Sequence, residues 1–267
     1  MRISPGLIAL VLLVVLAMAG LCEVLCMVVP QATGDVAWSE GGAVLDASNS
    51  GSGYIMVRKE SSKKLKVRVM YNKATYTYDL PGDGEYEVYP LQRGSGKYKV
   101  VVYQNVKGNS YSQVMTKSFD VKMEDEKAAF LCPNRYVDYT PESSMVALGS
   151  QLTEGISESA KKADAVMDWM MENFTYDYDL ARTVKSGYVP DLENLLVKKS
   201  GICFDFASAM CAMLRTQGIP SQLVMGYADN AYHAWCNVLI DDEWVRYDPT
   251  TAITKGKFKK YNEEACY

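Results

Sequence analysis

Between residues 43 and 123, hydrophobic and polar positions alternate in short runs, which is typical of β-strands with one buried face. In 65–69, three apolar side chains alternate with Lys66 and Arg68, so the apolar ones point to the same side of a strand. Runs rich in glycine, serine and aspartate separate these segments, as turns do. Short strands at this spacing indicate an all-β sandwich of immunoglobulin-like type. The pattern predicts strands at 54–58, 65–70, 75–78, 86–89, 98–103 and 114–121.

From residue 141 onwards the periodicity becomes helical. Apolar side chains at positions 163, 166, 167, 170 and 174 share one helix face, because they recur every three or four residues. Helices followed by an antiparallel sheet place this half of the chain in the α+β class. The pattern predicts helices at 141–154, 159–174, 192–198 and 203–217, followed by strands at 221–228, 232–240 and 243–248.

The helix predicted at 203–217 is apolar on almost every side, so we expect it to be buried. Gly201 breaks the chain just before it, and Gly218 is placed for a left-handed cap at its end. Asp205 is expected to serve the first turn. Cys203 lies at the helix start, where unpaired N–H groups and the helix dipole favour a thiolate over a thiol. This is a suitable setting for a nucleophile.

The two strands after this helix carry an imidazole and a carboxylate. If 241–242 form a two-residue turn, Trp235 pairs with Asp248, and His233 lies one diagonal step away on the same face. Diagonal neighbours lie about 7–8 Å apart, which long side chains can bridge. A slip of one residue would put the two on opposite faces. In this register the thiol, imidazole and carboxylate are the parts of an activated-nucleophile triad.

Five motifs in the second half of the chain carry a resemblance to a known family. Together they resemble the transglutaminase-like superfamily, whose members have a papain-like core. The resemblance covers roughly the last 140 residues and implies a triad of Cys203 as nucleophile, His233 as base and Asp248 as the group that orients the imidazole. In chain order the motifs are Gly201-Ile202-Cys203-Phe204-Asp205-Phe206-Ala207, Gly218-Ile219-Pro220, Gly226-Tyr227, His233-Ala234-Trp235 and Trp244…Asp248-Pro249-Thr250.

The resulting hypothesis is a cysteine-dependent acyl-transfer enzyme that acts on peptide or side-chain amides through a thioester, as a protease, amidase or transglutaminase. The alternative is a non-catalytic cell-surface binding module with the same fold. We expect the backbone N–H of Cys203 to serve as one oxyanion donor. Trp169 lies about where animal transglutaminases place an oxyanion-stabilising tryptophan, but its position inside a predicted packed helix argues against that role. Cys211 and Cys236 are expected to be ordinary buried thiols.

Composition excludes several other classes of function. The chain has 28 Lys and Arg against 32 Asp and Glu, a net charge of −4 with both signs dispersed, so we expect no nucleic-acid partner. It contains a single histidine, and its cysteines lack the paired C-x-x-C spacing of zinc sites. We therefore expect neither a metal ion nor a cofactor. The expected partner is a protein or peptide substrate, such as a cell-wall peptide.

The N-terminal 1–30 is predicted to be a signal peptide or a membrane anchor, because an apolar run follows Arg2. The apolar character continues through 7–29, close to the length that spans a bilayer, so this segment would anchor the chain if it is retained. We expect an extracytoplasmic protein, secreted or anchored to the outer face of the cell membrane. The expected organisation is a linker at 31–42, the β-sandwich at 43–123, a connector at 124–140 and the catalytic domain at 141–267.

Overall fold

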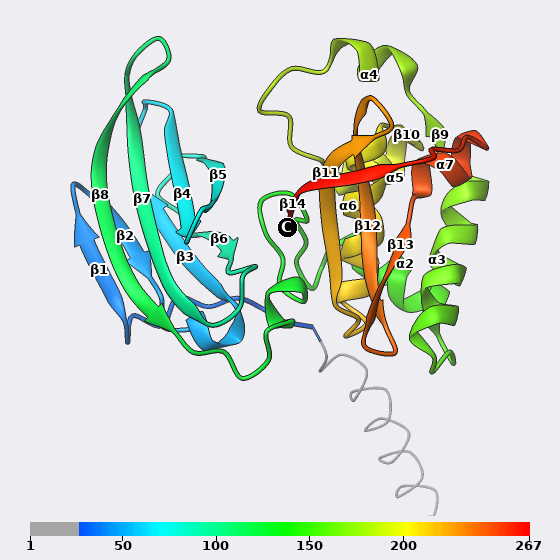
Figure 1. The fold of residues 1–267 in the computed structure, drawn as a ribbon, viewed down its shortest axis with the longest axis horizontal. Helices are drawn as coiled ribbons and strands as arrows, with labels where there is room; N and C mark the ends of the chain where they lie inside the picture. The colour runs from blue at the N-terminus through cyan, green and yellow to red at the C-terminus, as the bar shows by residue number, and fades with distance from the viewer. Residues whose placement is uncertain (1–26) are drawn as a thin grey trace, which may run out of the picture.

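The structure is a computed structural model that describes residues 27–267. The predicted signal or anchor at 1–30 lies almost entirely outside the described residues. Within 27–267, no helix is long and apolar enough to cross a membrane. Figure 1 shows an all-β part built from the first half of the chain beside a mixed part that carries the helices.

The N-terminal part consists of two four-stranded sheets, with strand orders β1-β2-β3-β6 and β5-β4-β7-β8. All neighbouring strands in both sheets are antiparallel. The two sheets enclose one shared core, to which Leu45 and Val57 contribute from one sheet and Val67 and Val100 from the other. The strands are β1 (Ala37–Glu40), β2 (Ala43–Asp46), β3 (Tyr54–Lys59), β4 (Leu65–Tyr71), β5 (Ala74–Leu80), β6 (Glu87–Pro90), β7 (Gly96–Lys107) and β8 (Ser110–Val121).

Strand β1 lies inside the segment that we expected to be a linker. It pairs with β2 through a hairpin whose two turn residues, Gly41 and Gly42, both have positive φ (56° and 75°). Such a turn matches the twist of the strands it joins. The sequence did not predict this strand, because four residues are too few for an alternation of apolar and polar positions to show.

The C-terminal part has helices packed against the sheet β13-β12-β11-β14, whose neighbouring strands are all antiparallel. This mixed α/β architecture agrees with the α+β class predicted from the sequence. The helices are α2 (Ser144–Thr153), α3 (Ser159–Asn173), α4 (Tyr178–Thr183), α5 (Leu192–Lys198), α6 (Cys203–Arg215) and α7 (Pro249–Thr254). The strands are β9 (Thr175–Tyr176), β10 (Ser200–Gly201), β11 (Ser221–Ala228), β12 (Ala231–Ile240), β13 (Glu243–Tyr247) and β14 (Tyr261–Cys266).

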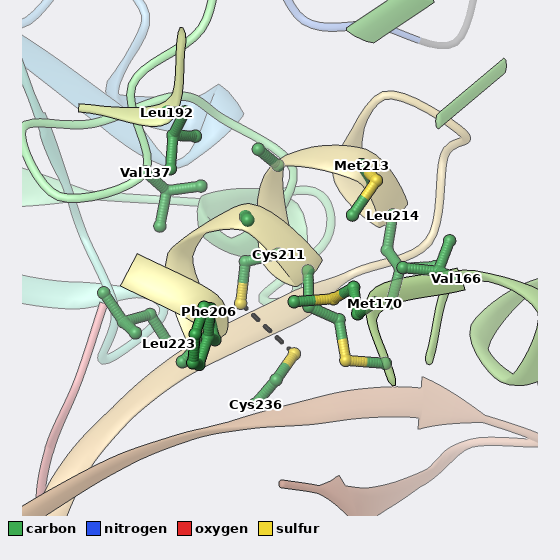
Figure 2. Close-up of a cluster of buried hydrophobic side chains, with 14 of the residues drawn as sticks. Val137, Val166, Met170, Leu192, Phe206, Cys211, Met213, Leu214, Leu223 and Cys236 are labelled. Atoms are coloured by element: carbon green, nitrogen blue, oxygen red, sulfur yellow. Dashed lines mark hydrogen bonds between the residues drawn. The ribbon is translucent and has the colours of Figure 1, made fainter. Parts of the chain in front are cut away.

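Helix α6 forms the centre of the C-terminal core, as its apolar composition predicts. Every residue from Phe204 to Arg215 is buried. Figure 2 shows part of the cluster around it, in which α2, α3 and the sheet all contribute side chains. The buried Arg215 guanidinium donates to the carbonyl oxygens of Ser221, Cys132 and Tyr267, so its donors are satisfied by backbone. The helix therefore holds both the sheet and the segment that follows the β-sandwich.

The β12–β13 register is the one that the two-residue turn predicts. Ile240 pairs with Glu243, and the turn residues Asp241 and Asp242 have positive φ of 50° and 66°. These φ values are typical of a type I′ hairpin turn, which aspartate tolerates better than most residues. The ladder runs back to the pair of Cys236 with Tyr247. The end of β13 therefore lies beside the part of β12 that carries the histidine.

Candidate active site

Cys203 is the first residue of α6, and its side chain is half-buried. The helix start is fixed by Asp205, whose carboxylate accepts from the Ile202 N–H (2.9 Å) and from the Tyr188 hydroxyl (2.8 Å). Burial raises the pKa of the Asp205 carboxyl, and these two hydrogen bonds oppose the rise. The first-turn role predicted for Asp205 is confirmed. A Cβ on Gly201 would lie 2.9 Å from the Asp205 Oδ2, so only glycine fits beneath this cap.

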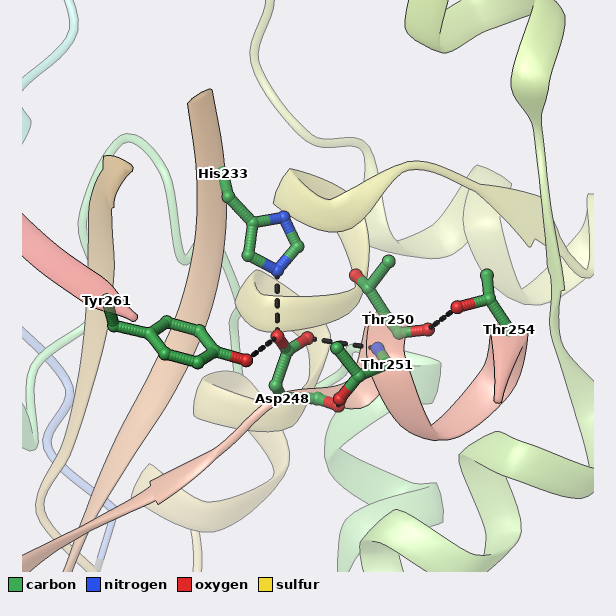
Figure 3. Close-up of polar contacts among 6 residues, drawn as sticks. All are labelled: His233, Asp248, Thr250, Thr251, Thr254 and Tyr261. Atoms are coloured by element: carbon green, nitrogen blue, oxygen red, sulfur yellow. Dashed lines mark hydrogen bonds and ion pairs between the residues drawn. The ribbon is translucent and has the colours of Figure 1, made fainter. Parts of the chain in front are cut away.

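His233 and Asp248 lie side by side, as the hairpin register predicts. Figure 3 shows the imidazole Nε2 directed at the carboxylate, and the distance from Nε2 to the Asp248 Oδ2 is 2.9 Å. Both residues are buried, at 5% and 8% exposure. Asp248 also begins α7, where its Oδ1 accepts from the Thr251 N–H at 3.1 Å and Pro249 occupies the first helical position. Hydrogen bonds from β12 and from α7 therefore hold the Asp248 carboxylate in place.

The surroundings of His233 favour its protonated form. Burial lowers the pKa of His233, but the hydrogen bonds with Asp248 and Cys203 and the negative charge of both partners outweigh it and raise this pKa to about 9. Since Nε2 is bound by Asp248, Nδ1 is the ring nitrogen that remains for the Cys203 sulfur. A protonated imidazole beside a cysteine at a helix N-terminus is the setting in which a cysteine can serve as a nucleophile.

Tyr261 is a further member of this cluster that sequence analysis did not find. Its hydroxyl donates to the Asp248 Oδ2 at 2.7 Å, and the Arg246 guanidinium lies 3.8 Å from the centre of its ring (Figure 3 shows the hydroxyl contact). Burial and the neighbouring carboxylate raise the pKa of Tyr261, which keeps the hydroxyl protonated as a donor. Tyr261 lies in β14, which pairs with β11. In a chain with 19 tyrosines, no spacing distinguishes this one.

Replacing Tyr261 with phenylalanine should lower the free energy of unfolding by about 1 kcal/mol, because the buried Asp248 Oδ2 loses a hydrogen-bond donor. Urea unfolding of both proteins measures the difference. The matched control is Tyr247→Phe, whose hydroxyl donates to Asp164 in an exposed position. The control should change stability by less than about 0.5 kcal/mol. An equal loss in the two variants would contradict the role of Tyr261 in fixing Asp248.

A cavity of about 560 Å³ lies between the β-sandwich and the C-terminal part. Cys203 and His233 both line it. The opposite wall comes from the β-sandwich, where Lys66 on β4 and Asp79 on β5 form an ion pair of 2.6 Å. The loop between α4 and α5, residues 184–189, lines the cavity as well. A substrate that reaches Cys203 therefore contacts both halves of the molecule.

The segment before the nucleophile carries two tyrosines and Trp169. Tyr176 lines the cavity, and burial followed by the charge of Cys203 raises its pKa to about 12. Tyr178 is exposed and packs edge-on against Tyr176. Trp169 lies in α3, with the Lys199 Nζ 4.6 Å from its ring centre, and packs on Phe174. In residues 27–267, no group of three or more His, Cys, Asp or Glu side chains is placed to hold a metal ion.

Comparison with known proteins finds a family match in the C-terminal part of the chain. The family model described as "Transglutaminase-like superfamily" matches residues 146–249, a range that contains all three triad candidates. The protein YebA of Bacillus subtilis (strain 168), described as uncharacterized, is 26% identical over 207 residues. That alignment takes in 68% of this chain but only 28% of YebA, so the chain spans little more than a quarter of its relative.

Three solved structures are similar to this chain at low sequence identity. A candidate cysteine protease from Cytophaga hutchinsonii has a TM-score of 0.45 and 17% identity, covering 80% of this chain and 83% of that one. The periplasmic domain of TgpA from Pseudomonas aeruginosa has a TM-score of 0.37 and 15% identity, with 85% and 77% covered. Red sea bream transglutaminase has a TM-score of 0.31 and 14% identity, with 74% and 48% covered. These similarities add nothing about substrate. Residues 146–249 therefore form a core that matches the transglutaminase-like superfamily.

Proposed function

We propose that the protein is a cysteine-dependent acyl-transfer enzyme that acts on peptide or side-chain amides. The observation that supports this most directly is the arrangement around His233. Its Nε2 lies 2.9 Å from the Asp248 Oδ2, and the same imidazole shares a cavity with Cys203 at the start of a buried helix. This is the nucleophile, base and orienting group that covalent acyl transfer needs.

In the proposed reaction, Asp248 holds the His233 imidazolium beside the Cys203 thiolate. The Cys203 Sγ attacks the amide carbonyl carbon, and the backbone N–H of Cys203 donates to the oxygen that becomes negatively charged. His233 then gives its proton to the departing ammonia or amine, which leaves a thioester on Cys203. Water or a primary amine next attacks the thioester, with His233 accepting the proton of the attacking group. The thiol is regenerated in either case.

Hydrolysis is the outcome that we rank first, and transfer to a primary amine such as a lysine side chain is second. The substrate that we propose is a protein or peptide at the outer face of the cell membrane, such as a cell-wall peptide. The apolar segment 7–29 would export or anchor the chain there. The β-sandwich, which we assign to the immunoglobulin-like type, would hold the substrate against Cys203, because Lys66 and Asp79 line the cavity.

Interception of the thioester tests the proposal without knowledge of the natural acceptor. Hydroxylamine is a small nucleophile that converts a thioester into a hydroxamate, whichever acceptor the enzyme normally uses. We expect the full chain to form hydroxamates on a mixture of casein peptides, detected by mass spectrometry. Hydroxamates at glutamine side chains would indicate side-chain amide chemistry, and those at new C-termini would indicate peptide cleavage. Formation no faster than in Cys203→Ala would contradict the proposal.

A further inference from the structure

Cys211 and Cys236 face each other inside the C-terminal core. Cys211 lies on α6, eight residues after Cys203, and Cys236 lies on β12, three residues after His233. Their sulfur atoms are 3.2 Å apart, and both residues are fully buried (Figure 2 marks the contact). The sequence predicts two ordinary buried thiols here, but burial alone does not place two sulfur atoms this close together.

We propose that Cys211 and Cys236 form a disulfide bond when the chain folds in the presence of a disulfide oxidant, linking the helix of the candidate nucleophile to the strand of the candidate base. A disulfide needs a sulfur–sulfur distance of about 2.05 Å, so the two atoms must approach by little more than about 1 Å. Helix α6 packs directly on β12, and the surrounding core is rich in methionine. Met170 and Met210 are flexible enough to fill the space that such a shift leaves.

The bond forms by two thiol–disulfide exchanges. The thiolate of one cysteine attacks a sulfur of a small disulfide such as glutathione disulfide, which creates a mixed disulfide and releases one glutathione thiolate. The thiolate of the second cysteine then attacks the protein sulfur of the mixed disulfide and releases the second glutathione. The two cysteines lose two protons and two electrons, and one glutathione disulfide is reduced to two glutathione thiols.

Burial of the two thiols determines when during folding this exchange can take place. In the folded chain neither thiol is accessible to an oxidant, and burial together with the Cys211 contact raises the pKa of Cys236, which disfavours its thiolate. In the unfolded chain both cysteines are accessible and ionise normally. The bond therefore forms before α6 closes on the sheet, and the folded protein keeps whichever state it acquired.

The bond would act on stability and not on the proposed chemistry. Cys236 and His233 are three residues apart on one strand, so their side chains point to opposite faces. Cys211 lies about two turns along α6 from Cys203, roughly 12 Å at 1.5 Å per residue. Cys203 is half-buried at the cavity and takes no part in the bond.

The test compares the full chain refolded from urea in detergent-containing buffer with glutathione disulfide or with a reductant. After refolding, free thiols are alkylated in denaturant and the cysteine peptides are identified by mass spectrometry without reduction. We expect Cys211 and Cys236 to resist alkylation and to appear as one cross-linked peptide pair. The oxidised protein should melt about 5–10 °C higher than the reduced one. Glutathione disulfide added after folding should produce little of the bond.

Two variants keep the test specific. Cys211→Ala should lose the oxidant-dependent rise in melting temperature, whereas Cys132→Ala, a buried cysteine next to the β-sandwich, should retain it. Alkylation of both Cys211 and Cys236 in the chain refolded with oxidant would overturn the proposal, as would a cross-link from either one to a different cysteine. Because this mass measurement uses the unsubstituted chain, the proposal can fail even if a variant does not fold.

Discussion

Cys203→Ala should lower the rate of hydroxamate formation by at least about a thousandfold, because no other group in the site can carry the acyl chain as a thioester. Of the residues that line the cavity, Cys203 alone supplies a thiol, and it lies beside the imidazole that would accept its proton. Loss of the sulfur removes the covalent intermediate and not merely a binding contact. The measurement is the initial rate of hydroxamate formation at saturating peptide.

The matched control for this substitution is Cys266→Ala. Cys266 is a free cysteine of the described region, half-buried like Cys203, but it lies on β14 beside Tyr76. We expect Cys266→Ala to keep the rate within about twofold, because surface and half-buried positions outside a site have small effects. Turnover by Cys203→Ala at the rate of the unsubstituted enzyme would exclude a cysteine mechanism and favour a role in binding alone.

His233→Ala should slow the alkylation of Cys203 by iodoacetamide at pH 6 by about a hundredfold or more. In the unsubstituted chain the imidazolium stabilises the sulfur anion, and a His233 pKa of about 9 keeps that charge in place through neutral pH. Without it, the rate should follow an ordinary thiol and rise only toward pH ~8.5. Site-resolved mass spectrometry across pH 6–9 measures the rate at Cys203, with Cys266 as an internal control.

The same pKa predicts how stability depends on pH. Folding raises the pKa of His233 from 6.5 to about 9, so protonation of this imidazole favours the folded state. Its contribution is complete below pH 6.5 and is lost as the pH rises through about 9. The stability difference between the unsubstituted chain and His233→Ala should therefore shrink over that range.

In the alkylation experiment, equal rates at Cys203 at pH 6 in the unsubstituted chain and in His233→Ala would show that the imidazole does not assist the thiol.

The sequence by itself determined the parts of the site that depend on local pattern. The bounds of α6 follow from Gly201 before it and Gly218 after it, which has the predicted left-handed conformation with φ of 72°. Helix α6 ends two residues earlier than expected, at Arg215, because the cap begins inside the predicted span. The pairing of His233 with Asp248 follows from a two-residue turn and strict alternation. Such features are encoded within about twenty residues, so periodicity can reveal them.

Only the tertiary structure decided which distant residues complete the site. Tyr261 reaches Asp248 because β14 runs back along β11 after α7, a path that no periodicity in the sequence indicates. Lys66 and Asp79 enter the cavity because the β-sandwich packs against the C-terminal part. The contact of Cys211 with Cys236 depends on how a helix and a strand dock. These contacts arise from packing between elements, whose geometry depends on the shape of the whole core and not on any one segment.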